Sequence, residues 1–334
     1  MKCPTCHEDC IPPAEVVLEN IYSMYMACDM CPPDPLFNKN TPFHEILKKN
    51  SGRCGKCGKR HLDYAMGNVL TILKEGGLFP QDATLREVGT PLIVFGYQIP
   101  YPPRLSNNSL ILLMDSITKP LADTIVSEVP EIKAVIKRTH SQSVGIIDTN
   151  TTPHTYELLS GCDMRCDVIS SCMGELCIYK NQSKIHIEFY NTKIKKIEEM
   201  YLKGEIENAV IVDALCGPGT LGLLCALGGA KKVILNDAWL PAIENTILNI
   251  KINSNILGVE IQFEANDDTL IRNQPYLMAI AKGMTEIMVY HGDIRKLGDE
   301  VKQCDICLVD SFPATEVSEF MVHCREISRK VVVI

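Results

Sequence analysis

The stretch that decides the fold runs from Asn208 to Asn253 and reads NAVIVDALCGPGTLGLLCALGGAKKVILNDAWLPAIENTILNIKIN. Its apolar, β-branched run over 209–215 predicts a short buried strand that ends at a turn. The glycines of that turn let the backbone approach a ligand where a Cβ atom would collide. A helix over 220–227 and a second strand over 232–236 follow. This order predicts a βαβ unit with a crevice at the carboxyl ends of its strands, where ligands of open α/β sheets bind.

Two acidic residues and a set of glycines frame the predicted crevice. Asp213 ends the first strand and Asp237 ends the second. The glycines at 217, 219 and 222 also satisfy the G-x-G-x-x-G spacing of dinucleotide-binding turns. A carboxylate at Asp213, however, would repel a pyrophosphate, whereas it suits the cationic amino-acid end of S-adenosylmethionine. We therefore favour S-adenosylmethionine as the cofactor, with NAD and a βαβ unit without a ligand as the alternatives.

The same segment resembles motif I of class I S-adenosylmethionine-dependent methyltransferases. The resemblance predicts an α/β, Rossmann-like class I methyltransferase domain in which the loop with Cys216, Gly217 and Gly219 contacts the cofactor. It also implies that Asp237 holds the ribose hydroxyls. A third strand, over 286–290, leads to a His-Gly-Asp turn that is similar to the family's adenine-binding turn. Asp293 in this turn is therefore assigned to the adenine amino group, with capping of a helix over 295–301 as the alternative.

Composition describes an ordinary globular protein. The 334 residues are 46% apolar and 22% charged, which is enough for two or three domains with sizeable cores. We expect a cysteine-rich zinc-binding domain over 1–62, an α/β middle domain over 63–205 that positions the substrate, and the methyltransferase domain over 206–334. Their formal charges of +1, −3 and −6 make up the net −8, so the chain has no global basic surface for nucleic acid.

The cysteines indicate a reducing compartment. The chain starts MKCPTCHEDC, without a basic-then-apolar signal peptide, and its most apolar window, over 209–230, is broken by Asp213, Pro218 and several glycines. We therefore expect a cytoplasmic protein that does not enter the membrane. Its sixteen thiols are then metal ligands or buried apolar residues.

The front of the chain has the spacing of a metal-binding module. Seven cysteines lie in the first 57 residues, six of them as three C-x₂-C pairs: Cys3, Cys6, Cys10, Cys28, Cys31, Cys54 and Cys57. A C-x₂-C turn presents two thiolates to one tetrahedral ion, so two pairs complete a structural zinc site. We expect one or two zinc ions, with His7, His44 or His61 as a candidate eighth ligand. An iron–sulfur cluster and buried unliganded thiols are the alternatives, although the C-x₃-C-x₂-C triplet of radical enzymes is absent.

The middle segment reads as mixed α/β. Helices are predicted over 63–75, 119–127 and 194–201, and strands over 110–114, 134–137 and 186–189. Its cysteines do not pair as C-x₂-C, and we interpret them as core or partly buried thiols: Cys162, Cys166, Cys172 and Cys177.

A family resemblance covers about residues 105–330. The stretches VPEIKAVIKRTHSQSVGIIDTNTTPHTYELLSG (129–161) and IHIEFYNTKIKKIEEM (185–200) precede the methyltransferase core. Together they resemble the archaeal and eukaryotic tRNA methyltransferases that modify N1 of the guanine beside the anticodon, and their wybutosine-pathway relatives. Glu157, Leu158, Leu159 and Gly161 match one family signature, and 189–190 lie near a second. An asparagine-punctuated helix over 242–252 matches a third.

The end of the chain departs from that family. A helix is expected over 275–282 as an insertion, followed later by a fourth strand over 304–310. Asp310 ends the fourth strand and Ser311 follows it, and we predict that both face the methyl acceptor, with Asp310 as the candidate base. Ser311 replaces the asparagine that binds guanine in the family, and the arginine expected after Gly145 is also absent. The chain stops in the fifth strand, over 331–334, without the family's terminal hairpin. We therefore expect either that this edge is completed from elsewhere, with a partner subunit as one source, or that the sheet is short.

Three functions remain open from the sequence. The first is an RNA (tRNA) methyltransferase, favoured by the resemblance and by the basic residues that end the cysteine-rich segment. The second is a methyltransferase of a protein side chain or a small cofactor, favoured by the acidic core. Transfer of the aminocarboxypropyl arm of the same cofactor is a variant of either. The third is a non-catalytic sensor that keeps the cofactor pocket.

Overall fold

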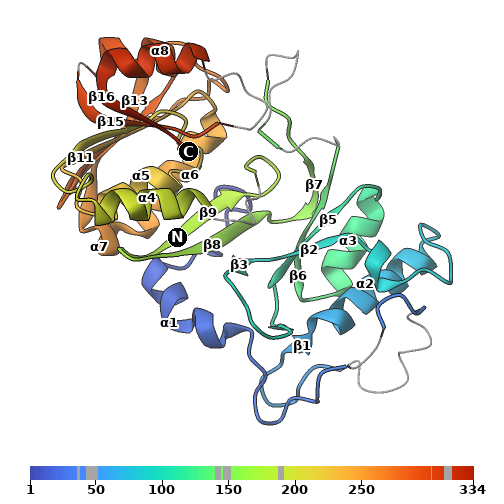
Figure 1. Cartoon of the computed structure of the whole chain (residues 1–334). Helices are drawn as coiled ribbons and strands as arrows, with labels where there is room; N and C mark the ends of the chain where they lie inside the picture. Colours follow the sequence, from blue (N-terminus) through green and yellow to red (C-terminus); the bar gives the residue numbers. More distant parts are fainter. Residues whose placement is uncertain are drawn as a thin grey trace. The chain divides into compact units, whose positions relative to one another are not determined.

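The computed structural model describes residues 1–35, 38–42, 52–139, 144–145, 152–186, 192–301, 303–311 and 318–334. The chain forms two compact units (Figure 1). Unit 1 contains residues 1–11, 17–142 and 155–167, and unit 2 contains residues 12–16, 143–154 and 168–334. Among the described residues, no helix is long and apolar enough to span a lipid bilayer.

Unit 2 is built on a seven-stranded sheet with the order β12-β13-β14-β11-β10-β15-β16. Five strands run parallel: β10 (Val210–Asp213), β11 (Lys232–Asp237), β14 (Glu286–His291), β15 (Cys304–Val309) and β16 (Ser328–Val333). The next four strands of the chain, β11 to β14, lie on one side of β10, and the chain then crosses to β15 on its other side. A topological switch point therefore lies between β10 and β15. This strand order confirms the predicted Rossmann-like fold of class I methyltransferases.

Helices cover both faces of this sheet, and Figure 1 shows α8 (Ser318–Ile327) on the face opposite α5 (Thr220–Leu227) and α6 (Leu240–Ile252). Side chains alternate between the faces with the period of two that a strand imposes. Ile211 joins a core shared with α4 (Thr192–Leu202), α5 and α6, whereas its neighbour Val212 joins a second core under α8 and the 3₁₀ helix η3 (Ile294–Asp299). The short helix α7 (Ser254–Leu257) closes the first core.

Two sequence predictions in this unit are wrong. The segment expected as an inserted helix over 275–282 is the strand β13 (Tyr276–Gly283), which pairs antiparallel with β12 (Val259–Glu264) and β14. An apolar run of eight residues fits a helix or a strand equally well, and pairing with the free edge of β14 decides for the strand. The helix expected over 295–301 is instead the 3₁₀ helix η3.

Strands β8 (Met164–Ser171) and β9 (Gly174–Asn181) form a hairpin, which joins β3 (Phe95–Gly96) in a three-stranded sheet with β9 at its edge. Neither β8 nor β9 is predicted from the sequence. The strand predicted over 186–189 lies outside the described residues except for His186.

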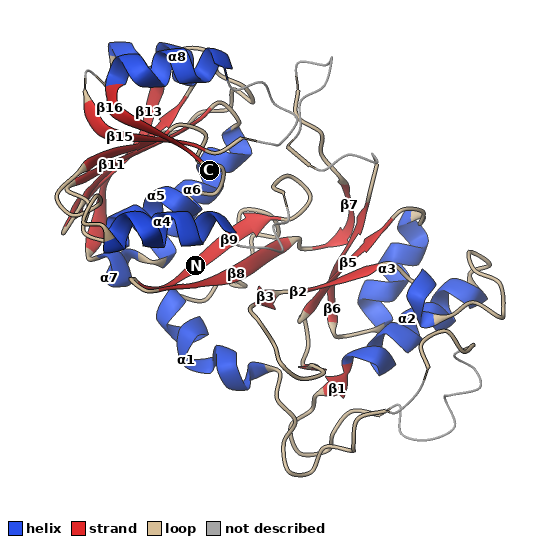
Figure 2. Cartoon of the chain, viewed as in Figure 1, coloured by secondary structure: helices blue, strands red, loops and turns tan. Residues whose placement is uncertain are grey.

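Unit 1 contains a four-stranded sheet with the order β2-β5-β6-β7 (Figure 2). Its strands are β2 (Thr90–Ile93), β5 (Leu110–Met114), β6 (Ile132–Lys137) and β7 (Glu157–Gly161). The helix α3 (Lys119–Glu128) packs on β6 and β7, and α2 (Leu62–Glu75) packs on α3. The helices predicted over 63–75 and 119–127 and the strands predicted over 110–114 and 134–137 are confirmed to within two residues. The remaining elements are short: α1 (Ala14–Met24), η2 (Leu85–Glu87), and the paired strands β1 (Arg60–His61) and β4 (Arg104–Leu105).

Candidate functional site

The parallel strands of unit 2 bring four predicted acidic residues to one edge of the sheet. Asp213 and Asp237 end β10 and β11, Asp293 follows β14 by two residues, and Asp310 follows β15 directly. Asp213 and Asp310 lie on either side of the topological switch point, because β10 pairs with β15. Ligands of open parallel sheets bind at this place.

Asp213 is buried, with 1% of its surface exposed, and only one of its two carboxylate oxygens accepts a hydrogen bond from the described residues. The Oδ2 atom accepts a hydrogen bond of 3.0 Å from the backbone N–H of Gly222, which lies in the first turn of α5. Within the described part of the chain, Oδ1 has no hydrogen-bond partner. Burial, followed by the negative charge of Asp310, raises the pKa of Asp213 to about 7. A buried carboxylate of this kind is stabilised when a cation binds beside it.

Two further buried polar atoms near the strand ends lack a partner among the described residues: Asn236 Oδ1 and Trp239 Nε1. Asn236 precedes Asp237 in β11, and Trp239 follows it. Buried polar atoms are almost always hydrogen-bonded in folded proteins. Like Asp213 Oδ1, these atoms are therefore candidate partners of a polar ligand at the strand ends.

The glycine turn between β10 and α5 has the geometry that its sequence predicts. Gly217 and Gly219 both have positive φ angles, of 53° and 86°, which favour glycine. Cys216 is buried, and its Sγ atom lies 3.7 Å from Oγ1 of Thr246. Burial raises the pKa of this thiol well above its usual value, so Cys216 is a neutral residue of the turn.

Asp237 contacts the glycine turn in this structure. Its Oδ2 atom accepts a hydrogen bond of 2.9 Å from the N–H of Gly217, and its Oδ1 atom accepts one of 2.9 Å from the N–H of Trp239. Burial raises the pKa of this carboxyl. The side chain is thus fixed between the turn and the second residue after β11, which is where the family resemblance places the ribose.

Asp293 adopts the capping geometry that was the alternative interpretation of this residue. Its Oδ1 atom accepts a hydrogen bond of 2.9 Å from the N–H of Arg295, and it is the N-cap of η3. The Arg295 guanidinium also pairs with both carboxylate oxygens. The assignment of Asp293 to the adenine amino group stays a prediction.

Asp310 has a partner that the sequence did not indicate. Lys193, at the start of α4, places its Nζ atom 2.9 Å from the Asp310 carboxylate. The two side chains are 29% and 19% exposed, so the pair remains within reach of solvent. Ser311 is half-buried beside it, and the Phe-Pro that follows Ser311 lies outside the described residues. The residues 189–190 and those after Gly145, which entered the family comparison, also lie outside them.

A second group that the sequence missed surrounds His291, which is fully buried at the end of β14. Its Nδ1 and Nε2 atoms lie 2.9 Å from Oδ2 of Asp267 and 3.0 Å from the carbonyl oxygen of Ala238. Arg272 pairs with the same carboxylate and, with the other contacts, holds the pKa of Asp267 well below its usual range. This network ties the loop before β13 to the residue that follows Asp237. No motif marks it, because the partners are distant in sequence.

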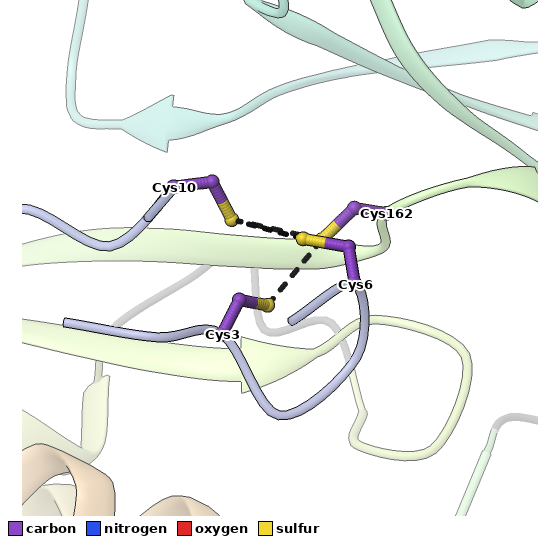
Figure 3. Close-up of side chains that lie close together, drawn as sticks. All are labelled: Cys3, Cys6, Cys10 and Cys162. Atoms are coloured by element: carbon purple, nitrogen blue, oxygen red, sulfur yellow. Dashed lines mark hydrogen bonds between the residues drawn. The ribbon is translucent and has the colours of Figure 1, made fainter. Parts of the chain in front are cut away.

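The predicted metal ligands come together as two groups of four cysteines in unit 1. The first group contains Cys3, Cys6, Cys10 and Cys162 (Figure 3), and the second contains Cys28, Cys31, Cys54 and Cys57. Within each group all the Sγ atoms lie within 4.8 Å of one another, and three Sγ–Sγ distances are 3.5–3.8 Å in the first group and 3.5–3.7 Å in the second. Cys162, interpreted from the sequence as a core or partly buried thiol, is buried and also belongs to the first group. It lacks a C-x₂-C partner, so sequence spacing could not identify it.

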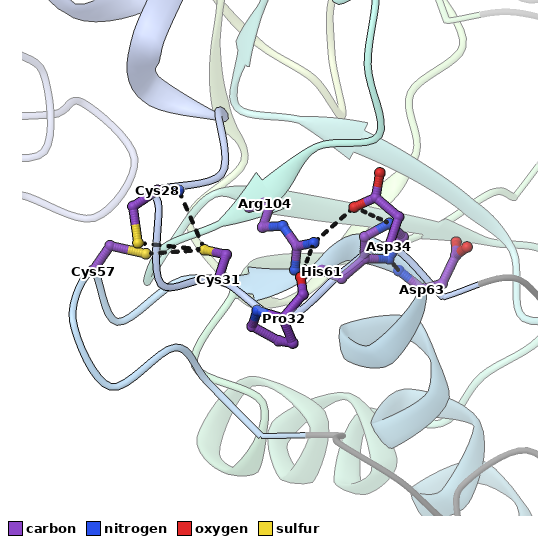
Figure 4. A network of polar contacts seen from close by, with 8 residues as sticks. All are labelled: Cys28, Cys31, Pro32, Asp34, Cys57, His61, Asp63 and Arg104. Atoms are coloured by element: carbon purple, nitrogen blue, oxygen red, sulfur yellow. Dashed lines mark hydrogen bonds and ion pairs between the residues drawn. The ribbon is translucent and has the colours of Figure 1, made fainter.

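Of the histidines considered as ligands, the two that the structure describes, His7 and His61, do not join these groups. The Nδ1 atom of His61 accepts a hydrogen bond of 3.1 Å from the N–H of Asp63 and thereby caps α2. Figure 4 shows it beside Asp34 and the buried Arg104, which donates to the carbonyl of Pro32 at 2.6 Å. Neither group includes His7, and His44 lies outside the described residues.

The fold and the crevice define an α/β protein of class I methyltransferase architecture. No family model matches the chain. Among curated proteins, it is 25% identical over 165 residues to an uncharacterized RNA methyltransferase of Clostridium acetobutylicum. The match covers 40% of this chain and 36% of that protein, so the chain spans about a third of the length of this relative.

Several solved structures are similar to this chain. TYW2 of Pyrococcus horikoshii in complex with MeSAdo has a TM-score of 0.45 and 16% identity, covering 79% of this chain and 76% of that one. The tRNA m1G37 methyltransferase of M. jannaschii has a TM-score of 0.38 and 17% identity, with coverages of 66% and 53%. Trm1 of Pyrococcus horikoshii with S-adenosyl-L-methionine has a TM-score of 0.36 and 22% identity, with coverages of 50% and 41%.

Proposed function

We propose that this protein is an S-adenosylmethionine-dependent methyltransferase that acts on RNA, with tRNA as the expected class. The observation that carries the cofactor is the buried Oδ1 atom of Asp213, which lies beside the glycine turn at the switch point and has no partner among the described residues. A dinucleotide would place a pyrophosphate near this carboxylate, whereas the ammonium of a methionyl group would neutralise it. The RNA substrate is supported by the curated relative, which is named as an RNA methyltransferase.

When bound, the cofactor supplies a methyl group on a sulfonium, which is already activated for displacement. The chain then has to bind and orient the two reactants in line, which is the larger part of the catalysis. We assign Cys216, Gly217 and Gly219 to the backbone wall of the cofactor pocket. Asp213 is assigned to the cationic amino-acid end, Asp237 to the ribose and Asp293 to the adenine.

The acceptor side is assigned to Asp310 and Ser311. The Asp310 carboxylate accepts a proton from the acceptor, and its ion pair with Lys193 fixes its orientation. The Ser311 hydroxyl both donates and accepts hydrogen bonds, so it suits a polar acceptor group. A serine is shorter than the asparagine of the guanine-methylating family, and we therefore do not extend the proposal to guanine N1.

Two observations favour a second candidate function. The segment 206–334 has a formal charge of −6, which disfavours a polyanion, and Ser311 replaces the base-binding asparagine. A protein side chain or a small cofactor is the acceptor in this alternative. Aminocarboxypropyl transfer remains a variant of both, because it depends on which sulfonium carbon faces the acceptor.

Zinc is the second ligand in the proposal. Four thiolates in a tetrahedral arrangement favour zinc or iron, and a complete set of four protein ligands is typical of a structural site. The metal therefore supports the fold of the cysteine-rich segment, 1–62, and takes no part in methyl transfer. All sixteen cysteines are free thiols, in keeping with a reducing compartment such as the cytoplasm.

Calorimetry with the purified full-length chain tests the cofactor. We expect S-adenosylhomocysteine to bind and NAD not to bind. The reverse result would replace the methyltransferase by a dinucleotide-binding protein, and binding of neither ligand would remove the cofactor assignment.

Radiolabelled methyl transfer tests the substrate class. The protein is incubated with methyl-labelled S-adenosylmethionine and either total RNA or total protein from cells. We expect label in tRNA, with RNA affinity that falls steeply as salt rises because phosphate contacts release counterions. Label in protein alone would select the second candidate function.

A further inference from the structure

Two independent observations each extend the proposed function. First, we infer that the chain holds two mononuclear, zinc-class ions, and that Cys162 supplies the last ligand of the first. This deepens the proposed structural metal. With a zinc–sulfur bond of about 2.3 Å, the edges of a tetrahedron of sulfurs are about 3.8 Å long. The shortest Sγ–Sγ distances of 3.5–3.8 Å in the two groups match this edge. An iron–sulfur cluster would distribute the four thiolates over two or four irons, so the four sulfurs could not all lie at the edge length of one tetrahedron.

The backbone around two of the cysteine pairs repeats one hydrogen-bonded turn. The carbonyl of Cys3 accepts from the N–H of His7 at 2.9 Å, and the carbonyl of Cys54 accepts from the N–H of Gly58 at 2.8 Å. The N–H of each cysteine also donates to a carbonyl five residues later. His7 and Gly58 have φ angles of 60° and 69°. Two different sequences thus adopt the same turn, and in both it points two thiols toward one centre.

Cys162 makes the first site a cross-link between distant segments. It follows Gly161 at the end of β7, whereas its three partners lie within the first ten residues. Its Sγ atom lies 3.5 Å from that of Cys3 and 3.8 Å from that of Cys10. A metal ion at this point fastens the start of the chain to the β7–β8 connection, across 159 positions of sequence. Closing so long a loop stabilises the folded state mainly by restricting the unfolded one.

Metal analysis of the full-length chain tests this site. We expect the wild type to retain two equivalents of zinc per chain in the presence of a chelator. Cys162→Ser should retain only one equivalent. Cys166→Ser is the matched control, because Cys166 is also buried but belongs to neither group, and it should keep both ions. Cobalt substitution gives a second readout, since the visible spectrum reports the number of thiolate ligands. One equivalent in the wild type, bound iron with sulfide, or equal metal content in the two variants would overturn the inference.

Second, we propose that the asparagines of α6 are positioning residues that hold the glycine turn and the strand β9 in one alignment. Asn245, Asn249 and Asn253 recur every four residues, so they share one face of the helix. All three are buried. They meet alternate residues of β9, because four helical residues rise about 6 Å and two strand residues about 6.6 Å.

Asn249 and Asn253 act toward β9 as a neighbouring strand would, whereas Asn245 accepts from the backbone N–H of Asn181 and donates to its side-chain Oδ1 atom. Asn249 accepts from the N–H of Tyr179 at 2.7 Å and donates to its carbonyl at 2.9 Å. Asn253 makes the same pair of bonds to Cys177, at 2.9 and 2.8 Å. Asn245 completes the ladder at Asn181. An amide side chain is needed here, because a carboxylate has no donor and an alkyl group has neither donor nor acceptor.

The same helix face holds the glycine turn. The Nδ2 atom of Asn249 also donates to the carbonyl of Pro218 at 2.9 Å, and the Thr246 hydroxyl donates to the carbonyl of Gly217 at 2.9 Å. Asn253 makes no bond to the turn in the described structure; its further bond goes back to the carbonyl of Asn249. Asn249 therefore joins the proposed cofactor loop to β9, whereas Asn253 serves β9 alone.

Calorimetric titration with S-adenosylhomocysteine separates these roles, and it rests on the proposed cofactor. We expect Asn249→Ala and Thr246→Val each to weaken binding about fivefold, the usual effect of losing one hydrogen bond. Asn253→Ala should lower Tm as Asn249→Ala does but change affinity less than twofold. Thr246→Val leaves the hydrogen bonds between the asparagines and β9 intact. If Asn249→Ala does not fold, Thr246→Val therefore still tests whether the bond from α6 to the glycine turn supports cofactor affinity. Thr246→Ser, which keeps the hydroxyl, should have wild-type affinity.

The outcomes distinguish the two levels of inference. A wild type that ignores S-adenosylhomocysteine would refute the proposed function itself. The ladder would have a purely structural role, with the cofactor assignment intact, if the wild type bound S-adenosylhomocysteine and two further results were found. In Asn249→Ala and Asn253→Ala the loss of affinity would follow the loss of Tm, and in Thr246→Val the affinity would not change.

Discussion

At the residue scale, Asp213 shows how a function can conflict with stability. Its carboxyl is buried and its Oδ1 atom has no hydrogen-bond partner among the described residues, so ionisation is disfavoured and its pKa rises to about 7. In the unfolded chain the same group loses its proton near the ordinary value of 3.8. The folded state therefore binds more protons between these pH values, and the free energy of unfolding falls as the pH rises through this window.

Replacing Asp213 by asparagine tests this conflict. The amide still accepts from the N–H of Gly222 but carries no charge, so we expect Tm to rise by a few degrees at pH 8 and by less at pH 5, at about 2–4 °C per kcal/mol. We expect affinity for S-adenosylhomocysteine to fall at least tenfold. Wild-type affinity should itself increase from pH 6 to pH 8, as Asp213 ionises.

Differential scanning calorimetry and titration calorimetry give the two quantities. Asp299→Asn, which removes an exposed acid from the same unit, is the control and should change neither. Unchanged affinity in Asp213→Asn would remove this residue from the pocket.

At the scale of the element, Gly161 sets the end of β7. Its φ angle of 80° favours glycine, and a Cβ atom there would lie 2.0 Å from the backbone oxygen of Lys133 in β6. Neither strain nor overlap is relieved by a side-chain movement, because the obstacle is backbone. Cys162 follows at once, so the same glycine also places a proposed metal ligand.

We expect Gly161→Ala to destabilise unit 1 by more than the roughly 1 kcal/mol that a positive φ alone costs. It should also loosen the metal at the first cysteine group. Gly77→Ala is the matched control, since Gly77 has a φ of 71° in the same unit but nothing within 4 Å of its Cβ position. Denaturant unfolding and zinc release to a chromogenic chelator measure the two effects. Equal destabilisation of both variants would show that β6 and β7 do not approach as closely as the structure indicates.

At the scale of the whole molecule, the two proposed ligands belong to different units. All eight clustered cysteines lie in unit 1, and the predicted cofactor residues lie in unit 2. The single tryptophan of the chain, Trp239, lies in unit 2 directly after the proposed ribose-binding region. Its fluorescence therefore reports the unfolding of one unit, while circular dichroism reports both.

We predict that metal removal and cofactor binding act on separate unfolding transitions. A chelator with a thiol-reactive mercurial should lower the midpoint seen by circular dichroism while leaving the tryptophan midpoint within a few degrees. S-adenosylhomocysteine should raise the tryptophan midpoint, because a ligand that binds only the folded state stabilises it. A single transition that both reagents shift equally would mean that the units unfold as one.

The sequence by itself determined the βαβ core, the glycine turn, the acids at the strand ends and seven of the eight clustered cysteines. These features are local, since each depends on a periodicity, a turn or a spacing within a few residues. The tertiary structure alone decided the rest. Cys162 joins three cysteines more than 150 positions away, Lys193 meets Asp310 across 117 positions, and the run over 275–282 becomes a strand because β14 offers it an edge. Such contacts depend on how distant segments pack, which no local pattern of residues encodes.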